Sequence, residues 1–181
     1  GVPISDPAEI PGLLTPDGQF MKRQQWQRPL PVAQVRRELT RQVNRVLEHG
    51  WTPTHLDSHH HIHAYPEVLD VVIELATTLR LPVRAVDAAM RAQLAAAGIA
   101  TSDSFSMAFY GNAATVETLI TLAEDSPDGV LEIMTHPGYA AEDLPSSYRS
   151  EREQELAALT DPRWRAHCAE HDISLVGFDE I

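Results

Sequence analysis

Cysteine is almost absent from this chain, because Cys168 is the only one among 181 residues. A single thiol cannot form an intrachain disulfide, which excludes a small scaffold held together by disulfides. We therefore expect a reducing compartment and a cytoplasmic location. Cys168 lies in a pattern typical of a helix, which favours a small buried side chain over a nucleophile.

Basic residues are also scarce: 14 Lys and Arg stand against 26 Asp and Glu, and the formal net charge is −12. Nucleic acids and anionic membrane surfaces are bound by basic patches, so we expect neither as a partner. No apolar run is long enough to span a bilayer, and no signal peptide is recognisable.

The composition is typical of a globular domain. Hydrophobic residues make up 43% of the chain and charged residues 22%. These proportions are typical of a folded protein and not of a disordered one. A chain of this length can bury a sizeable core, so we expect one domain spanning residues 1–181.

Histidine is concentrated at one place. Five of the nine histidines lie between His55 and His63, together with Asp57. Imidazole and carboxylate are the side chains that bind divalent metals and transfer protons near neutral pH. The competing interpretations are a solvated histidine-rich loop and core histidines satisfied by the backbone, and the clustering favours a metal or catalytic site over both.

The spacing within this cluster depends on its conformation. In an extended segment, residues of one parity share a face. In a helix, His59 and His63 would instead lie one turn apart, as in paired metal ligands. Pro53 disfavours helix at Thr52, so we expect a strand that runs into a loop before the next helix. The residues that would share one face are His55, Asp57, His59, His61 and His63.

Strands alternate with helices along the rest of the chain, which predicts an α/β fold with a parallel sheet or a barrel. The predicted helices cover about 31–49, 66–79, 87–97, 114–124, 151–159 and 162–171. The predicted strands, besides the histidine-rich one, cover about 82–85, 104–110, 130–136 and 173–178. A polar loop is expected at 139–150.

A second candidate site lies at the end of a predicted buried strand. Val130 to His136 is largely apolar, and Pro137-Gly138 breaks the strand at once. A side chain at the carboxyl end of a parallel strand is well placed to face a pocket. His136 is therefore a candidate catalytic residue, with a purely structural histidine as the alternative.

At this point the sequence resembles a known family. Thr54 to His63 is similar to the T-H-x-D-S-H-x-H-x-H signature of the YdjC-like carbohydrate deacetylases, the family of chitooligosaccharide deacetylase. Glu132 to Tyr139 resembles its E-h-M-x-H-P-G-Y block. Weaker blocks agree at Val83 to Ala85 (R-A), at Phe105 to Gly111 (F-x-x-x-F-Y-G) and at Tyr148 to Pro162 (R-x-x-E-x-x-x-L-T-D-P). The resemblance covers nearly the whole chain.

The resemblance implies a distorted (β/α) barrel related to NodB-type polysaccharide deacetylases. It also implies removal of an acetyl group from an N-acetylated sugar or oligosaccharide, with a divalent metal, Mg or Zn, as cofactor. By position, His59 matches a metal ligand. His136 matches the histidine near the scissile bond, as an acid or transition-state stabiliser, and Arg84 would orient a carboxylate or the substrate.

The other members of the histidine cluster would support this site. The resemblance implies that His61, His63 and Asp57 contact the ligand residues or the substrate. For Asp57, the physical expectation is that its carboxylate orients a ligand imidazole.

Two family motifs do not occur in this sequence. The N-A-D-D-F-G strand and the G-x-H-x-x-L strand would supply the metal-binding Asp, the base and another His ligand. We therefore expect an incomplete barrel that lacks its N-terminal segment and is inactive alone. Its exposed strand edges would be covered by the missing strands or by another chain, as in a homodimer. Two alternatives stay open: a phosphoesterase-like metal hydrolase, and a non-catalytic remnant.

Overall fold

The computed structural model describes residues 1–26, 29–141 and 146–181. Its chain contacts divide it into two compact units, Gly1–Thr101 and Ser102–Ile181. Both units combine helices with short parallel pairings, so the α/β class predicted from the sequence is confirmed. None of the helices in these described ranges has both the length and the apolar composition needed to cross a bilayer.

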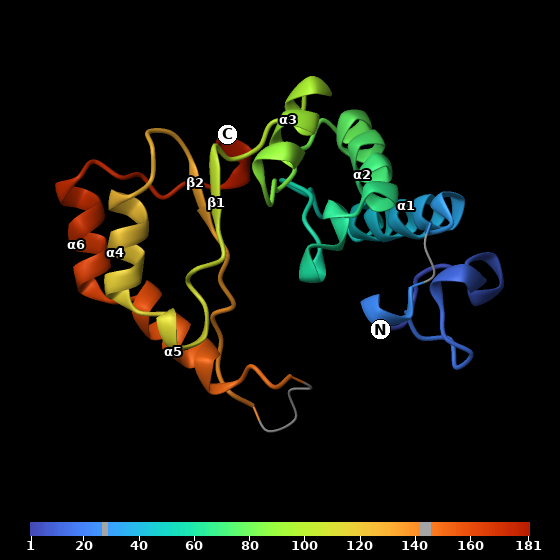
Figure 1. Cartoon of the computed structure of the whole chain (residues 1–181), viewed down its shortest axis with the longest axis horizontal. Helices are drawn as coiled ribbons and strands as arrows, with labels where there is room; N and C mark the ends of the chain where they lie inside the picture. Colours follow the sequence, from blue (N-terminus) through green and yellow to red (C-terminus); the bar gives the residue numbers. More distant parts are fainter. Residues whose placement is uncertain (27–28, 142–145) are drawn as a thin grey trace. The chain divides into compact units, whose positions relative to one another are not determined.

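The first unit is built on helices α1 (Val32–Glu48), α2 (Pro66–Leu79) and α3 (Ala88–Ala96). α1 packs directly against α2 (Figure 1). Pro66 occupies the first turn of α2, where its missing N–H is not needed. Asp87 caps α3 by accepting a hydrogen bond from the Met90 amide at 2.8 Å. The core between these helices includes fully buried Val71, Val83 and Leu94.

A parallel bridge joins two extended segments of this unit, pairing Leu56 with Val83. The Leu56 amide donates to the Pro82 carbonyl at 2.9 Å, and the Arg84 amide donates to the Leu56 carbonyl at 3.1 Å. Val83 is fully buried and Leu56 packs against the same core. The pairing therefore fixes where the residues on either side of Leu56 and Val83 must lie.

The first residues of the chain are held to α1 by a buried carboxylate. Glu38 is 3% exposed and accepts hydrogen bonds from the amides of Ile4 and Ser5, at 3.1 and 2.9 Å, and from Gln42. Burial by itself favours the neutral carboxyl, but these hydrogen bonds outweigh it and lower the pKa of Glu38. Glu38 thus stays ionised inside the unit.

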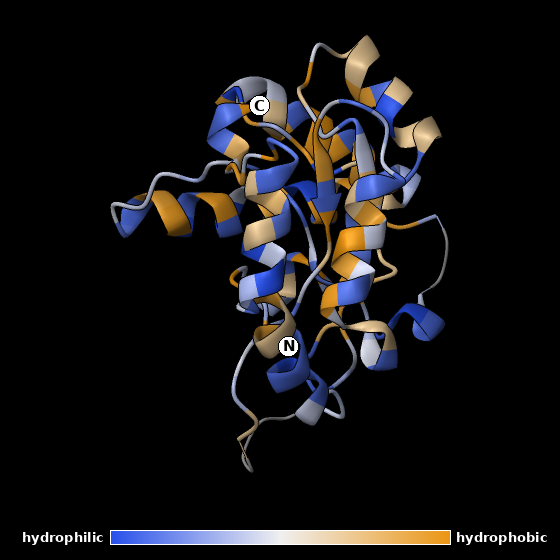
Figure 2. Ribbon diagram, turned by 90° about the vertical axis from the view of Figure 1, so that its left-hand side faces the viewer, coloured by the Kyte–Doolittle hydropathy of each residue, from blue (hydrophilic) through white to orange (hydrophobic). Residues whose placement is uncertain are grey.

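The second unit contains the two-stranded parallel sheet of β1 (Ser104–Ser106) and β2 (Leu131–Ile133), with Ser104 opposite Leu131. Its helices are α4 (Val116–Glu124), α5 (Ser150–Leu159) and α6 (Pro162–Glu170), and α4 contacts both of the others. Figure 2 shows apolar and polar residues alternating along the helices, as expected where one face of each is buried.

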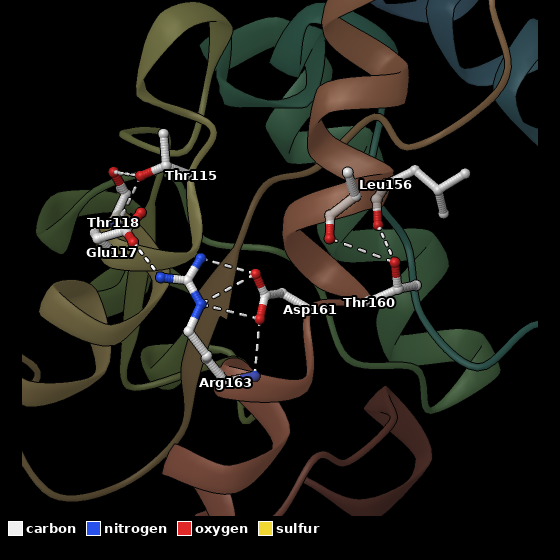
Figure 3. Close-up of polar contacts among 8 residues, drawn as sticks. Thr115, Glu117, Thr118, Leu156, Thr160, Asp161 and Arg163 are labelled. Atoms are coloured by element: carbon white, nitrogen blue, oxygen red, sulfur yellow. Dashed lines mark hydrogen bonds and ion pairs between the residues drawn. The ribbon is translucent and has the colours of Figure 1, made fainter.

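Polar contacts fix the start of α6. Asp161 caps the helix by accepting from the Arg163 amide at 2.8 Å, and Pro162 follows in the first turn. The Arg163 guanidinium bridges Asp161 and Glu117 of α4, at 2.8 and 2.6 Å (Figure 3). Hydrogen bonds to both carboxylates raise the pKa of Arg163. Cys168, on the same helix, is buried as predicted, and burial raises the pKa of its thiol.

The predicted helices are confirmed to within about two residues at each end, whereas several predicted strands are wrong. No strand forms at 173–178: Ile173 to Gly177 is irregular, and a 3₁₀ turn covers Phe178–Glu180. The strands expected at 82–85 and in the histidine-rich segment are reduced to the single bridge of Val83 with Leu56. The strands expected at 104–110 and 130–136 shorten to β1 and β2. Part of the predicted polar loop, 142–145, lies outside the described residues.

The wrong strand predictions have one physical cause. A short apolar run predicts burial, but a strand exists only where a neighbour accepts its ladder of hydrogen bonds. Leu175 and Val176 are 73% and 48% exposed, so no neighbour in the described chain covers them. Leu47, expected on the apolar stripe of α1, is likewise 43% exposed.

We predict that Leu94→Ala destabilises the first unit by roughly 2–5 kcal/mol, because the Leu94 side chain is fully buried and its truncation leaves a cavity. Urea unfolding followed by circular dichroism measures this change. The matched control, Leu47→Ala on an exposed helical position of the same unit, should change stability by no more than about 0.5 kcal/mol. Equal effects of the two substitutions would contradict the described core.

Candidate functional site

The histidine cluster starts in an extended segment and then turns sharply. The chain is extended up to Ser58, and a 3₁₀ segment follows at His59–Ala64. Inside it, His60 and His61 adopt left-handed backbone conformations, with φ of 55° and 52°. Such conformations are unfavourable for residues with a Cβ, by about 1 kcal/mol each. The expectation that His55, Asp57, His59, His61 and His63 share one face is therefore wrong beyond Ser58.

The turn gives neighbouring histidines different environments. His59 and His60 are exposed, with their ring centroids 3.9 Å apart. His61 is half-buried, with its ring centroid 6.1 Å from that of His63. His63 is 1% exposed. One short segment thus offers two solvent-facing imidazoles and one that belongs to the core.

Both ring nitrogens of His63 are committed to the fold. Nε2 lies 3.1 Å from the Arg84 carbonyl, which can only accept, so this nitrogen carries the proton. Nδ1 then accepts from the Ser58 hydroxyl at 2.6 Å, and the Ser58 oxygen accepts from the His63 amide at 2.9 Å. Burial lowers the pKa of His63, which keeps the ring neutral. His63 therefore has no lone pair left for a metal.

Asp57 and Arg84 come together beside this histidine. The Arg84 guanidinium lies 2.7 Å from Asp57 Oδ2, and the two side chains are 15% and 39% exposed. The parallel bridge explains the meeting, because Asp57 follows Leu56 and Arg84 follows Val83 in adjacent extended segments. Arg84 thus contacts a carboxylate of this chain, and its role in a reaction stays a prediction. The expected contact of Asp57 with a ligand imidazole stays a prediction.

The described residues do not make a complete metal site. No group of three or more His, Cys, Asp and Glu side chains in ranges 1–26, 29–141 and 146–181 is arranged to hold an ion. Protein sites for zinc need three or four such ligands. His59 is exposed, so it fits the role of one ligand among several, and not that of a site by itself.

The second unit places His136 just beyond the carboxyl end of β2. The Met134 amide donates to the Ser106 carbonyl at 2.9 Å, which continues the pairing with β1 past Ile133. The chain then leaves the sheet, and the His136 side chain remains 34% exposed. Its position at a strand end agrees with the sequence-based prediction.

A fully buried carboxylate from α5 lies against His136. Glu155 is 0% exposed, and one of its oxygens, Oε2, accepts a hydrogen bond from the His136 amide. The other oxygen, Oε1, lies 3.5 Å from His136 Nδ1 and accepts a hydrogen bond from the Tyr148 hydroxyl. A single carboxylate therefore contacts the backbone and the ring of the candidate catalytic histidine.

Two tyrosines complete this cluster. The Tyr148 hydroxyl also accepts from the Gly111 amide at 2.8 Å, and burial together with the Glu155 hydrogen bond raises the pKa of Tyr148 to about 12. Tyr110 stacks on Tyr148 with ring centroids 4.4 Å apart and an interplanar angle of 13°. The imidazole of His136 meets both rings edge-on, at 5.7 and 5.6 Å.

Arg152 ties the loop to the helix in the same place. Its guanidinium donates to the Tyr148 carbonyl at 2.9 Å and to the His136 carbonyl at 3.4 Å. The Arg152 carbonyl accepts in return from the Gly138 amide at 3.2 Å. The turn after His136 is thus held in position through main-chain contacts.

Sequence reasoning did not single out Glu155, Tyr148 or Tyr110. All three lie in segments that resemble family blocks, Phe105 to Gly111 and Tyr148 to Pro162, but the resemblance assigns no role to them. Conversely, His59, Asp57 and Arg84 belong to the first unit and His136 belongs to the second. The described contacts join Asp57 to Arg84 in one unit, and His136 to Glu155 in the other.

The buried neutral His63 predicts a dependence of stability on pH. Its pKa is lowered in the folded state, so the unfolded chain binds more protons below its own histidine pKa of about 6.5. The stability that His63 contributes should therefore be present above pH 6.5 and be lost as the pH falls below it. Asp57, Arg84 and His61 surround the ring and are part of the same electrostatic environment.

Urea midpoints measured between about pH 7.5 and pH 5.5 check this prediction. His63→Gln should lower stability at pH 7.5 and flatten the decline towards pH 5.5, whereas His49→Gln, at an exposed position, should preserve the wild-type profile. Identical profiles of wild type and His63→Gln would contradict the buried neutral imidazole.

The comparisons with known proteins agree on one family. The model of the family described as "YdjC-like protein" matches residues 1–170. A carbohydrate deacetylase of Geobacillus stearothermophilus is 39% identical over 179 residues, covering 96% of this chain and 70% of that protein. A chitooligosaccharide deacetylase of Proteus mirabilis (strain HI4320) is 32% identical over 171 residues, covering 91% of this chain and 67% of that protein.

A solved structure supports the same assignment. A protein of Enterococcus faecalis V583, provisionally described as a cellobiose-phosphate cleavage protein, superimposes with a TM-score of 0.90. The match has 26% sequence identity and covers 99% of this chain and 72% of that one. The matching family model, the curated relatives and this structural similarity lead to one conclusion: the chain belongs to the YdjC-like protein family.

Proposed function

We propose that this protein is a hydrolase that removes acetyl groups from an N-acetylated sugar or oligosaccharide. The names of its relatives, carbohydrate deacetylase and chitooligosaccharide deacetylase, support the reaction and the substrate class. The observation that carries the proposal within this chain is the pairing of His136 with a fully buried carboxylate at the end of β2. A histidine in that setting suits proton transfer to a leaving amine.

His136 is the proposed catalytic acid. Amide hydrolysis releases an amine, which is a poor leaving group unless it is protonated as the C–N bond breaks. The half-exposed imidazole can meet a substrate, while its Nδ1 edge remains buried beside Glu155. The general base that activates the water need not belong to the cluster of His136, Glu155, Tyr110 and Tyr148.

The proposed roles of residues in the first unit concern the substrate and the turn of the histidine cluster. Arg84 is proposed to orient the Asp57 carboxylate or the substrate. His61 is a candidate substrate contact. His63 is better suited to supporting the turn, because both of its nitrogens are committed.

Dependence on a divalent metal, Mg or Zn, is part of the proposal. His59 is the proposed ligand within this chain, and one imidazole does not make a site, so the other ligands must come from groups outside the described cluster. A distorted (β/α) barrel, a cytoplasmic location, a homodimer and the absence of nucleic acid and membrane partners are further proposals that follow from the sequence.

Two other functions compete with this one. A phosphoesterase-like hydrolase usually needs several carboxylates for two metals. In the histidine cluster the one carboxylate, Asp57, is paired with Arg84. A non-catalytic remnant would explain the lack of a complete metal site, but it gives no reason for the buried Glu155 beside His136.

We predict that the full-length protein releases acetate from N-acetylglucosamine oligomers and that a chelator abolishes this release. Adding back Zn or Mg should restore activity, and the better metal identifies the cofactor. His59→Ala should raise the metal concentration needed for half-maximal activity by about 10-fold or more, because the variant loses one metal ligand. Turnover of phosphate esters with no acetate release would favour the phosphoesterase-like function.

We also predict that His136→Ala lowers kcat for acetate release by about 10²–10⁴-fold with a small change in KM, since it removes a proton donor used in the transition state. The control is His171→Ala, an exposed histidine of the same unit, which should leave kcat unchanged. A large rise in KM at constant kcat would instead make His136 a substrate-binding residue.

A further inference from the structure

Glu155 has an acidic side chain with no exposed surface, and the proposed function does not say what this side chain does in the reaction. Placing an ionised carboxylate in a protein interior is unfavourable by several kcal/mol unless donors surround it. Glu155 meets this requirement with the His136 amide and the Tyr148 hydroxyl, one on each oxygen. A structural anchor could be built from these two contacts alone.

The imidazole ring of His136 also contacts Glu155, and a purely structural role of Glu155 would not need this contact. Its Nδ1 is buried and makes no hydrogen bond with described residues, yet it lies 3.5 Å from Glu155 Oε1. A third of the His136 side chain is exposed, so the exposed part of the ring lies away from Nδ1. Hydrogen bonds of catalytic pairs are often long before substrate binds and shorten afterwards.

The side chains around the His136 imidazole include one carboxylate, that of Glu155. Tyr110 and Tyr148 pack edge-on against the ring. The Arg152 guanidinium lies nearby but donates to the carbonyls of Tyr148 and His136, on the main chain. Glu155 is therefore the one carboxylate that the described contacts bring to the ring.

We propose that Glu155 is the positioning residue of the reaction: it holds the imidazole of His136 with Nδ1–H towards its carboxylate and leaves Nε2 for the substrate. The inference rests on the proposed deacetylase function. In the step, the oxygen of one water forms the new bond to the acetyl carbon. The C–N bond breaks with its electron pair on nitrogen, and nitrogen takes the proton from Nε2 of the imidazolium.

The remaining proton of the water restores the imidazolium, so the products are acetate in its acid form and the free amine. The Glu155 carboxylate faces the imidazolium and stabilises its charge, as carboxylates do in other histidine pairs. The same carboxylate also fixes Tyr148, whose hydroxyl holds the Gly111 amide beside Tyr110. Glu155 thereby positions Tyr148 as well as the imidazole of His136.

Glu155→Gln in the full-length protein tests the proposal, because the amide has nearly the same shape but no charge. We expect kcat to fall by about 10²–10⁴-fold with KM changed less than about 3-fold, and Glu155→Asp to recover part of kcat. Glu153→Gln is the matched control on an exposed turn of the same helix and should keep wild-type kcat. A normal kcat in a folded Glu155→Gln variant would overturn the proposal.

A second measurement needs no substrate. In protein labelled with ¹⁵N-histidine, the nitrogen chemical shifts of neutral His136 should report the Nδ1–H form in wild type and a shift towards the Nε2–H form in Glu155→Gln, since the amide NH₂ can donate to Nδ1. An unchanged tautomer in the variant would overturn the positioning role. If the tautomer changes but no acetylated sugar is hydrolysed, the proposed function fails and the pairing stands.

Tyr148→Phe separates the two duties of Glu155. It removes the hydroxyl that Glu155 holds and keeps the ring that packs on His136. We expect a kcat within about 10-fold of wild type and the wild-type tautomer of His136. A loss of kcat equal to that of Glu155→Gln would overturn the proposal, because Glu155 would then act through the tyrosine loop and not through the imidazole.

Discussion

A buried carboxylate must be matched by hydrogen-bond donors, and in the second unit this requirement falls on Glu155. Its two oxygens accept from the main chain at the end of β2 and from the loop tyrosine that precedes α5. Through Tyr148 it also fixes the amide of Gly111, in the loop after β1. Three segments that are distant in sequence are therefore held by one side chain, and the candidate catalytic histidine lies where they meet.

The first unit follows the same rule with different groups. Glu38 holds the first residues of the chain to α1, and Ser58 with the Arg84 carbonyl holds His63. The strained turn at His60 and His61 is tolerated because His63 anchors its end in the core. This arrangement leaves His59 exposed, and it pairs Asp57 with Arg84 through the parallel bridge of Leu56 and Val83.

Helices were easier to predict than strands, and particular elements explain why. The interval Pro66–Leu79 carries a proline in its first turn and an apolar stripe of helical period, so its bounds follow from local signals. The segment at 173–178 has strand-like composition, but its ladder needs a neighbour that composition does not specify. The candidate site divides in the same way, because the residue types of the histidine cluster are visible in the sequence and their different burial is not.

The sequence by itself determined the α/β class, the helices, the family and the candidacy of His59, Arg84 and His136. These follow from local periodicity and from motifs whose residues are adjacent in the chain. Only the tertiary structure decided that His63 is a neutral core residue, that Asp57 pairs with Arg84, and that Glu155 lies against His136. Contacts of this kind join residues far apart in sequence, and burial, which no short pattern encodes, sets their charge and their available atoms.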